Sequence, residues 1–161
     1  MFNNYLLLFF PLAITLHNIE EALWLPQWSH HAAKYHSPVE KNEFHFALII
    51  ITALAYLVTF FRVILPDVVF ISWIFYGFLG VMIINAIFPH LVATIALKKY
   101  APGLFTGIFL IIPINSILIY RAVSIGFTTM TEVIIATAAV GTLLILIIPL
   151  LFKAGGRLIN Y

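Results

Sequence analysis

Cysteine is absent from the 161-residue sequence, and charged residues are scarce. Without cysteine the chain can form no disulfide, cannot use a thiolate nucleophile and cannot bind a metal through sulfur. Only 9 % of the residues are Asp, Glu, Lys or Arg, whereas a soluble domain uses roughly 25 % to cover its surface. The small and dispersed net charge of +2 also argues against nucleic-acid binding, which needs a clustered basic surface.

Long apolar runs take the place of the missing charge. Hydrophobic residues make up 63 % of the chain, and the mean hydropathy is +1.11. A helix of about 20 apolar residues crosses the hydrocarbon core of a bilayer. We therefore expect an all-α integral membrane protein, a polytopic helical bundle with about five transmembrane helices. It should form a single membrane domain over residues 1–161, with helices at about 5–25, 46–62, 68–97, 104–121 and 132–152.

Three local signals refine these helices. The opening residues MFNNY lack the basic residues of a secretory signal peptide, so we expect the first run to remain as a spanning helix. Pro26 is expected to end that helix, because proline lacks an amide proton and restricts the residue before it. The run 68–97 is longer than a bilayer requires and is expected to break near Pro89, which would free the carbonyl of Asn85.

The distribution of basic residues predicts the orientation in the membrane. With five helices, six Lys and Arg residues lie on the side of the first loop, the third loop and the C-terminal tail, namely Lys34, Lys41, Lys98, Lys99, Lys153 and Arg157. The other side carries only Arg62 and Arg121. Because cytoplasmic loops are enriched in Lys and Arg, we expect a bacterial cytoplasmic-membrane protein with its N-terminus outside and its C-terminus in the cytoplasm.

The segment HNIEE places an imidazole and two carboxylates near the end of the first apolar run. Glu20 and Glu21 follow His17 by three and four residues, so all three side chains share one helix face. Charged groups of this kind are costly in hydrocarbon, and in a membrane helix they indicate a functional site by default. The expected topology brings four more polar residues to the same depth: His45, Asn85, His90 and Thr106.

These residues also carry a resemblance to a known family. The HNIEE motif, together with Asn85, His90 and the pattern Pro102-Gly103-x-x-Thr106, resembles the membrane proteins named for their HXXEE motif. The recognisable features run from Thr15 to Thr106. The resemblance implies a membrane protein in which these residues matter, and it implies no reaction, because the function of that family is uncharacterised.

Histidine and carboxylates at helical spacing suit a divalent metal. We expect the ligands to come from His17, Glu20, Glu21, His90 and His45, with zinc favoured and iron or manganese chemically compatible. A glutamate that does not bind the metal would act as general base, and Asn85 and Thr106 would orient a ligand or polarise a substrate carbonyl. This predicts a metal-dependent hydrolase acting on a lipid or another amphiphile that reaches the site from the bilayer.

Two other classes of function remain open at this point. Protonatable residues beside a broken helix are also typical of a small proton-coupled transporter. The same residues could instead form a buried polar knot in a structural or assembly protein, with no turnover. The loop histidines, His30, His31 and His36, are expected at the membrane interface because they show no regular metal-ligand spacing. A homo-oligomer is compatible with the sequence, which leaves the oligomeric state open.

Overall fold

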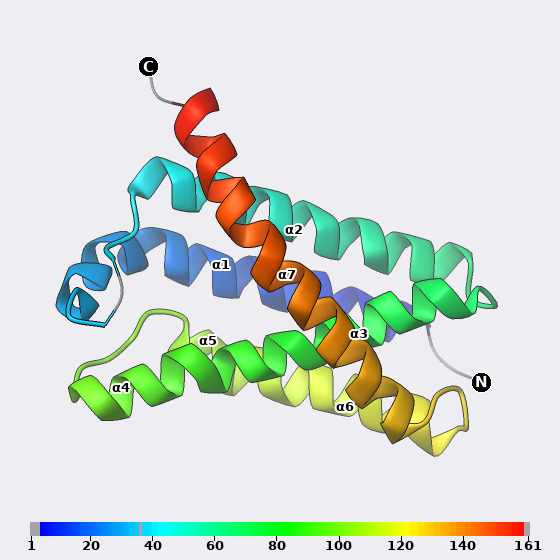
Figure 1. Cartoon of the computed structure of the whole chain (residues 1–161). Helices are drawn as coiled ribbons and strands as arrows, with labels where there is room; N and C mark the ends of the chain where they lie inside the picture. Colours follow the sequence, from blue (N-terminus) through cyan, green and yellow to red (C-terminus); the bar gives the residue numbers. More distant parts are fainter. Residues whose placement is uncertain (1–3, 36, 160–161) are drawn as a thin grey trace.

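The protein folds into a bundle of membrane-spanning helices (Figure 1). The structure is a computed structural model, and it describes residues 4–35 and 37–159. Five helical spans in these residues are long and apolar enough to cross a membrane: Tyr5–Ala32, Lys41–Ile64, Val69–Leu97, Leu104–Ser124 and Met130–Leu158. The prediction of an all-α membrane protein with five spanning helices is confirmed.

The first span continues through a proline. It consists of η1 (Asn4–Leu8), α1 (Phe9–Trp28) and η2 (Ser29–Ala32), so α1 runs past Pro26, where the sequence analysis expects its end. A proline leaves the carbonyl four residues earlier without its helical partner. Here that carbonyl belongs to Ala22, and the Nε2 atom of His45 lies 2.9 Å from it. A side chain from the second span thus replaces the missing backbone hydrogen bond.

The remaining elements follow in chain order. They are α2 (Lys41–Ile64), α3 (Val69–Asn85), η3 (Ala86–Leu91), α4 (Val92–Leu97), α5 (Leu104–Thr106), η4 (Gly107–Ile111), α6 (Ile112–Ser124) and α7 (Met130–Leu158). Both α2 and α7 extend into polar sequence beyond the expected bounds of 46–62 and 132–152, because helical hydrogen bonding continues where the apolar pattern stops. Thr129 and Glu132 form a capping box at the start of α7, away from the candidate site.

Two helices are irregular in the same region of the bundle. The third span is interrupted at Phe88, the residue before Pro89, which has non-helical backbone angles (φ −126°, ψ 114°) inside the π-helical segment η3. The fourth span contains the second π-helical segment, η4. Such bulges are frequent at functional sites because they turn side chains and backbone groups away from the regular helical ladder.

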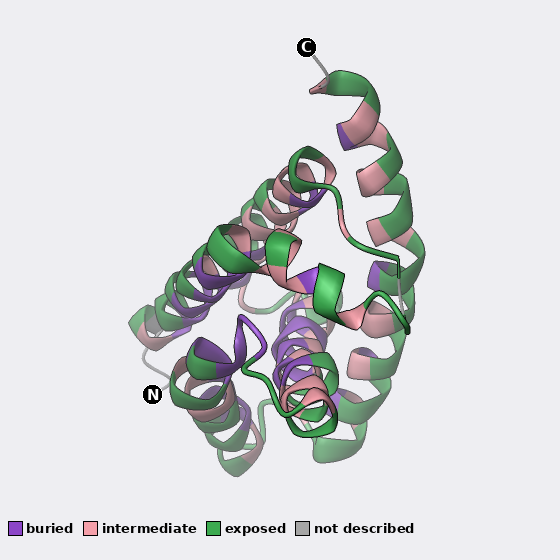
Figure 2. Cartoon of the chain, turned by 90° about the vertical axis from the view of Figure 1, so that its left-hand side faces the viewer, coloured by how far each residue is buried: buried purple, intermediate pink, exposed green. Residues whose placement is uncertain are grey.

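Helix α7 crosses α3 at close range through small residues (Figure 1). A Cβ atom added at Gly77 would lie 2.6 Å from the backbone oxygen of Ala136, and one added at Gly80 would lie 2.0 Å from the Oγ1 atom of Thr137. Small residues allow close backbone approach, and in a membrane this packing replaces the missing hydrophobic driving force. Viewed from the end of the bundle, buried residues line the inward helix faces (Figure 2).

Replacing Gly77 by alanine should therefore destabilise the bundle, because the clash is with the backbone of α7, which cannot rotate away. Overpacking of this kind costs about 1–3 kcal/mol. Gly141 is the matched control on α7, since an added Cβ would only touch Val81 at 3.4 Å. Gly141→Ala should keep or raise stability by up to ~1 kcal/mol through helix propensity. Thermal unfolding in detergent compares the two, and equal stabilities would contradict this account of the α3–α7 contact.

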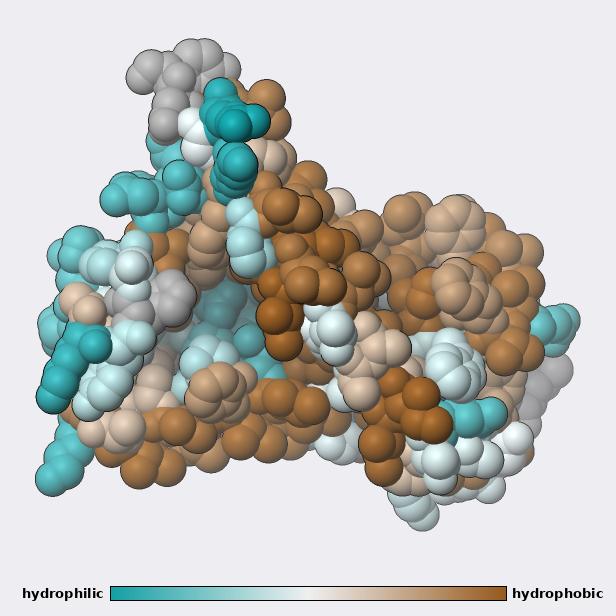
Figure 3. Space-filling view, viewed as in Figure 1, coloured by the Kyte–Doolittle hydropathy of each residue, from teal (hydrophilic) through white to brown (hydrophobic). Residues whose placement is uncertain are grey.

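The surface carries the expected membrane pattern. In Figure 3 the middle of the molecule is hydrophobic, and hydrophilic residues gather at the end that carries the loop after α1 and the C-terminal part of α7. Near this end the face is hollowed between α4 and α7, and hydrophilic atoms form the floor of the hollow (Figure 3). Figure 1, in the same view, shows α1 behind this hollow.

Candidate functional site

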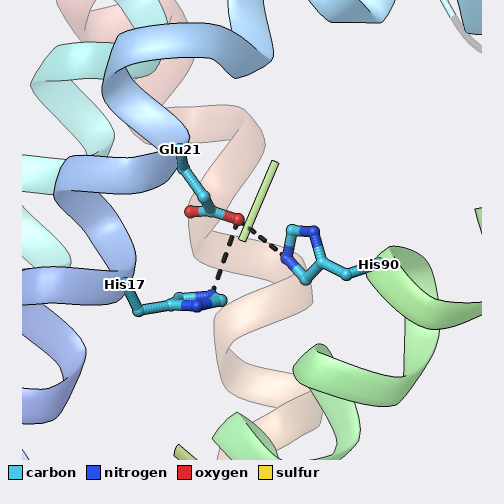
Figure 4. Close-up of side chains that lie close together, drawn as sticks. All are labelled: His17, Glu21 and His90. Atoms are coloured by element: carbon cyan, nitrogen blue, oxygen red, sulfur yellow. Dashed lines mark ion pairs between the residues drawn. The ribbon is translucent and has the colours of Figure 1, made fainter. Parts of the chain in front are cut away.

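The candidate site lies where α1 meets the two irregular segments η3 and α5–η4. Three residues meet there at ligand distance: His17 and Glu21 from α1 and His90 from η3. Figure 4 shows the two α1 side chains pointing across to the imidazole of His90. One His17 nitrogen, one Glu21 oxygen and one His90 nitrogen all lie within 4.8 Å of one another. We call these three residues the triad.

The carboxylate of Glu21 lies between the two imidazoles. Its Oε1 atom is 2.8 Å from Nε2 of His90 and 3.7 Å from Nε2 of His17. In a tetrahedral zinc site, metal–ligand bonds of about 2.0–2.2 Å place ligand atoms ~3.3 Å apart. The observed separations lie on either side of that value. The two contacts of Glu21 are thus close to the spacing of zinc ligands.

The triad is nearly inaccessible. The side chains of His17, His90 and Glu21 are 0 %, 2 % and 10 % exposed. Asn85 completes the site: its Nδ2 atom is 3.2 Å from Nε2 of His17 and 3.3 Å from Nε2 of His90. An amide N–H can donate to the lone pair of a neutral imidazole nitrogen. An ionised Glu21 can only accept, so the 2.8 Å contact places a proton on Nε2 of His90, and the Asn85 amide then donates to Nε2 of His17.

Glu20 is directed to a different partner from Glu21. Its Oε1 atom accepts hydrogen bonds from the backbone N–H of Gly103, at 2.9 Å, and from the hydroxyl of Tyr100. Its Oε2 atom accepts from the backbone N–H and the hydroxyl of Thr106, at 2.9 and 2.6 Å. The amides at the start of a helix have no intrahelical acceptors and favour a negative charge. Glu20 therefore caps the helix that begins at Leu104.

Thr106 connects this cap to the triad. Its hydroxyl proton points to the carboxylate of Glu20, which can only accept, so its oxygen must accept a hydrogen bond from Nδ1 of His17 at 3.0 Å. The proton of a neutral His17 is then on Nδ1, and the lone pair of Nε2 accepts from the amide of Asn85, whose Nδ2 atom lies 3.2 Å away. Metal-binding histidines commonly have their second nitrogen fixed in this way.

Tyr100 closes the outer side of the cap. Its hydroxyl donates to Glu20 and accepts from the backbone N–H of Phe105 at 3.1 Å. Burial and the hydrogen bond to Glu20 raise the pKa of the Tyr100 hydroxyl to about 12. The phenol therefore stays protonated at physiological pH and remains a donor to Glu20.

Gly103 is required where the cap meets the two imidazoles. Its φ of +93° lies in the region that favours glycine. A Cβ atom there would be 2.7 Å from Cε1 of His90 and 3.0 Å from Cε1 of His17. The pattern Pro102-Gly103-x-x-Thr106 thus brings a helix start against α1, with no room for a side chain between the rings.

Gly103→Ala should disturb the site beyond its backbone strain. Gly126 provides the matched control, because it also has a positive φ of +71° but has nothing within 4 Å of an added Cβ. A non-glycine residue at positive φ costs about 1–2 kcal/mol, so both variants should lose stability by that amount. Only Gly103→Ala should also displace the imidazoles and lower zinc retention, as measured by metal analysis. Equal zinc retention in the two variants would contradict this assignment.

The structure does not bring every predicted residue to the triad. His45 bonds the Ala22 carbonyl and lies outside the group, so the structure does not bring this predicted ligand to the triad. The carboxylate of Glu20 accepts four hydrogen bonds, and it is not part of the group formed by the triad. His30 and His31 are exposed, and His36 lies outside the described residues.

Sequence reasoning missed the site roles of Tyr100 and Gly103. The signal available was the pattern Pro-Gly-x-x-Thr, which is typical of a helix start, since proline and glycine mark a turn and threonine follows in the first helical turn. A helix start attracts anions. Two adjacent carboxylates elsewhere in the chain could have suggested that one of them caps it.

Comparisons with known proteins identify the family of the chain. Residues 8–119 match the family described as "Protein of unknown function with HXXEE motif". The matched range contains the triad, Glu20, Asn85 and the Pro-Gly-x-x-Thr segment. The chain is 55 % identical over 153 residues to the uncharacterized protein YrkK of Bacillus subtilis (strain 168), covering 95 % of this chain and 97 % of the relative. No solved structure matches the chain. The chain belongs to the HXXEE-motif family of membrane proteins.

Proposed function

We propose that the triad binds a divalent metal, zinc in the first place, and that the protein is a metal-dependent membrane hydrolase acting on a lipid or another amphiphile. The observation that carries the proposal is the convergence of His17, Glu21 and His90, with His17 fixed by the Thr106–Glu20 pair. The three residues would hold the ion, and a set of three protein ligands is typical of catalytic rather than structural zinc.

The chemistry follows from the ligand set. Zinc lowers the pKa of bound water to about 7 and so supplies hydroxide as a nucleophile at neutral pH. With Glu20 engaged as a helix cap, the proposal does not depend on a separate glutamate base. The amide of Asn85, which lies against both imidazoles, would orient these ligands or polarise a carbonyl of the substrate. Iron or manganese would accept the same ligands.

The substrate class is inferred from location. The exposed part of the triad belongs to Glu21, and the hydrophilic hollow between α4 and α7 opens at this end of the bundle (Figure 3). A compound that enters between spanning helices must itself be soluble in the bilayer, which favours a lipid ester, a lipid amide or a similar amphiphile.

Hydrolysis by reconstituted protein tests the proposal. The protein is placed in vesicles that contain a mixed panel of phospholipids, lipid esters and lipid amides, with zinc, iron, manganese or a chelator, and mass spectrometry measures the products. We expect product formation that a chelator abolishes, that zinc restores and that His90→Ala lacks. If the alanine variants of all three triad residues keep full activity, the proposal is wrong.

We also propose that the triad lies near the cytoplasmic side, since the predicted orientation puts its end of the bundle there. The natural absence of cysteine makes the test simple, because a single Lys99→Cys variant is then the only target for a thiol reagent. A membrane-impermeant maleimide should label this variant in lysed cells or inverted vesicles and not in intact cells. Labelling in intact cells would show that the protein has the opposite orientation, with Lys99 outside.

A second candidate, a small proton-coupled transporter, is favoured by buried polar atoms in the other half of the bundle. Among the described residues, the side-chain atoms Nε and Nη1 of Arg62, the hydroxyl of Tyr76 and Oδ1 of Asn115 are buried without a hydrogen-bond partner. Unpaired buried groups of this kind indicate internal water. Proton uptake by proteoliposomes under a pH gradient tests this candidate, and its loss in Arg62→Leu together with Tyr76→Phe would support it.

A further inference from the structure

A groove on the outside of the bundle lies next to the Glu20 cap. Its volume is about 830 Å³, and it lies between α1 and the segment 100–110. Its walls are apolar: Leu16, Ile19 and Leu23 on α1 stand opposite Phe105 and Leu110. These α1 and Phe105 side chains are 49–63 % exposed, so they face the bilayer and need a hydrophobic cover there. None of the three triad residues lines the groove.

One end of the groove is polar and basic. Gln27, Trp28 and His31 line it there, and the amine of Lys99 contacts Nε2 of His31. Both His31 and Lys99 are exposed. The carboxylate of Glu20 also reaches the groove, but four hydrogen-bond donors already surround it. The groove therefore combines a hydrocarbon-sized apolar channel with a cationic end.

We propose that the groove binds one anionic phospholipid, with an acyl chain between α1 and the segment 102–110 and the phosphate at the His31–Lys99 pair. Charge complementarity selects this occupant. A zwitterionic lipid fits the apolar walls equally well, but its net neutral headgroup gains less from an ammonium group. One basic residue near an anionic headgroup changes affinity by roughly fivefold. Binding here is independent of the proposed metal, because the ligand residues lie behind the Glu20 cap.

Native mass spectrometry of the full chain in detergent tests the proposal. Phosphatidylglycerol and phosphatidylcholine with the same acyl chains are offered in equal amounts, with a chelator present so that metal plays no part. Wild type should retain one phosphatidylglycerol with at least about fivefold preference. Lys99→Gln should reduce that preference roughly fivefold and leave phosphatidylcholine retention unchanged. Lys153→Gln should behave as wild type, because Lys153 is an exposed lysine on α7, whereas Lys99 contacts the groove residue His31.

A second variant tests the apolar channel. Ile19→Trp fills the groove from an exposed position and should lower retention of both lipids at an unchanged melting temperature. Several outcomes would overturn the proposal: equal retention of the two lipids by wild type, an equal effect of Lys153→Gln and Lys99→Gln, or full retention in Ile19→Trp. The proposal is also wrong if wild type is a dimer without bound lipid and Ile19→Trp is a monomer. That result would show that a second copy of the chain covers the groove.

Discussion

Glu21→Ala is expected to abolish stoichiometric zinc binding while leaving the helical bundle folded. The variant removes the oxygen that lies 2.8 Å from His90 and 3.7 Å from His17, and two imidazoles alone are a weak site. Loss of an outer hydrogen-bond partner typically lowers metal affinity ~10–100-fold. Loss of the carboxylate ligand should exceed about 100-fold. Metal analysis of detergent-purified protein, equilibrated with zinc and then dialysed, measures the effect.

His45→Ala is the control that separates ligand loss from loss of a buried histidine. It removes the hydrogen bond to the Ala22 carbonyl next to Pro26, so stability should fall by about 1 kcal/mol. Zinc binding should remain stoichiometric, because His45 lies outside the triad. The proposed ligand set is wrong if His45→Ala loses as much zinc as Glu21→Ala. If wild type binds no zinc, iron or manganese, the polar-knot interpretation replaces the metal site.

The spanning helices were predictable because hydrocarbon imposes a strict requirement. Every backbone polar group in the bilayer core must find a partner within the protein, so long apolar runs can only be helices. The ends of the helices were not predictable by the same argument. Beyond the hydrocarbon core, water and side chains offer other partners, and α2 and α7 continue into polar sequence there. At Pro26 a tertiary contact from His45 overrides a strong local signal to end the helix.

The separation of roles between Glu20 and Glu21 shows the limit of helical periodicity. Both residues share the face of His17, since they follow it by three and four positions. Adjacent residues are nonetheless rotated by about 100° around the helix axis. That rotation sends Glu21 toward His90 on η3 and Glu20 toward the helix start at Gly103. Which glutamate meets which partner depends on the packing of two other spans, and the motif itself carries no information on it.

The interruption of the third span explains how His90 reaches the triad. In a continuous helix, Asn85 and His90 are five positions apart and point in different directions. The break at Phe88 and the π-helical geometry of η3 bring Nδ2 of Asn85 to 3.3 Å from Nε2 of His90. Sequence analysis could place a break near Pro89 from the length of the apolar run. It could not give the resulting side-chain directions, because these depend on the backbone angles at the break.

Thr106→Val is expected to weaken zinc binding ~10–100-fold without removing any ligand. Valine has nearly the shape of threonine but no hydroxyl, so Nδ1–H of His17 would lose its acceptor and Glu20 would lose one of its four donors. An unpaired buried donor costs about 1–3 kcal/mol. The imidazole can avoid that cost by moving its proton to Nε2 or by turning, and either change withdraws the lone pair from the metal.

Two further substitutions decide whether Thr106 acts through its hydroxyl. Thr106→Ser keeps the hydroxyl and should restore zinc affinity to within about threefold of wild type, because both hydrogen bonds can form again. Thr59→Val removes another buried hydroxyl, one that bonds the Ala55 carbonyl on its own helix, and should leave the affinity unchanged. Competition with a fluorescent zinc chelator gives the three dissociation constants. If Thr106→Ser lowers zinc affinity as much as Thr106→Val does, position 106 acts through packing and not through its hydroxyl. If the Thr106→Val variant binds zinc as tightly as wild type, the hydroxyl does not orient His17. The hydrogen bonds between Glu20 and Thr106 then serve only to cap the helix.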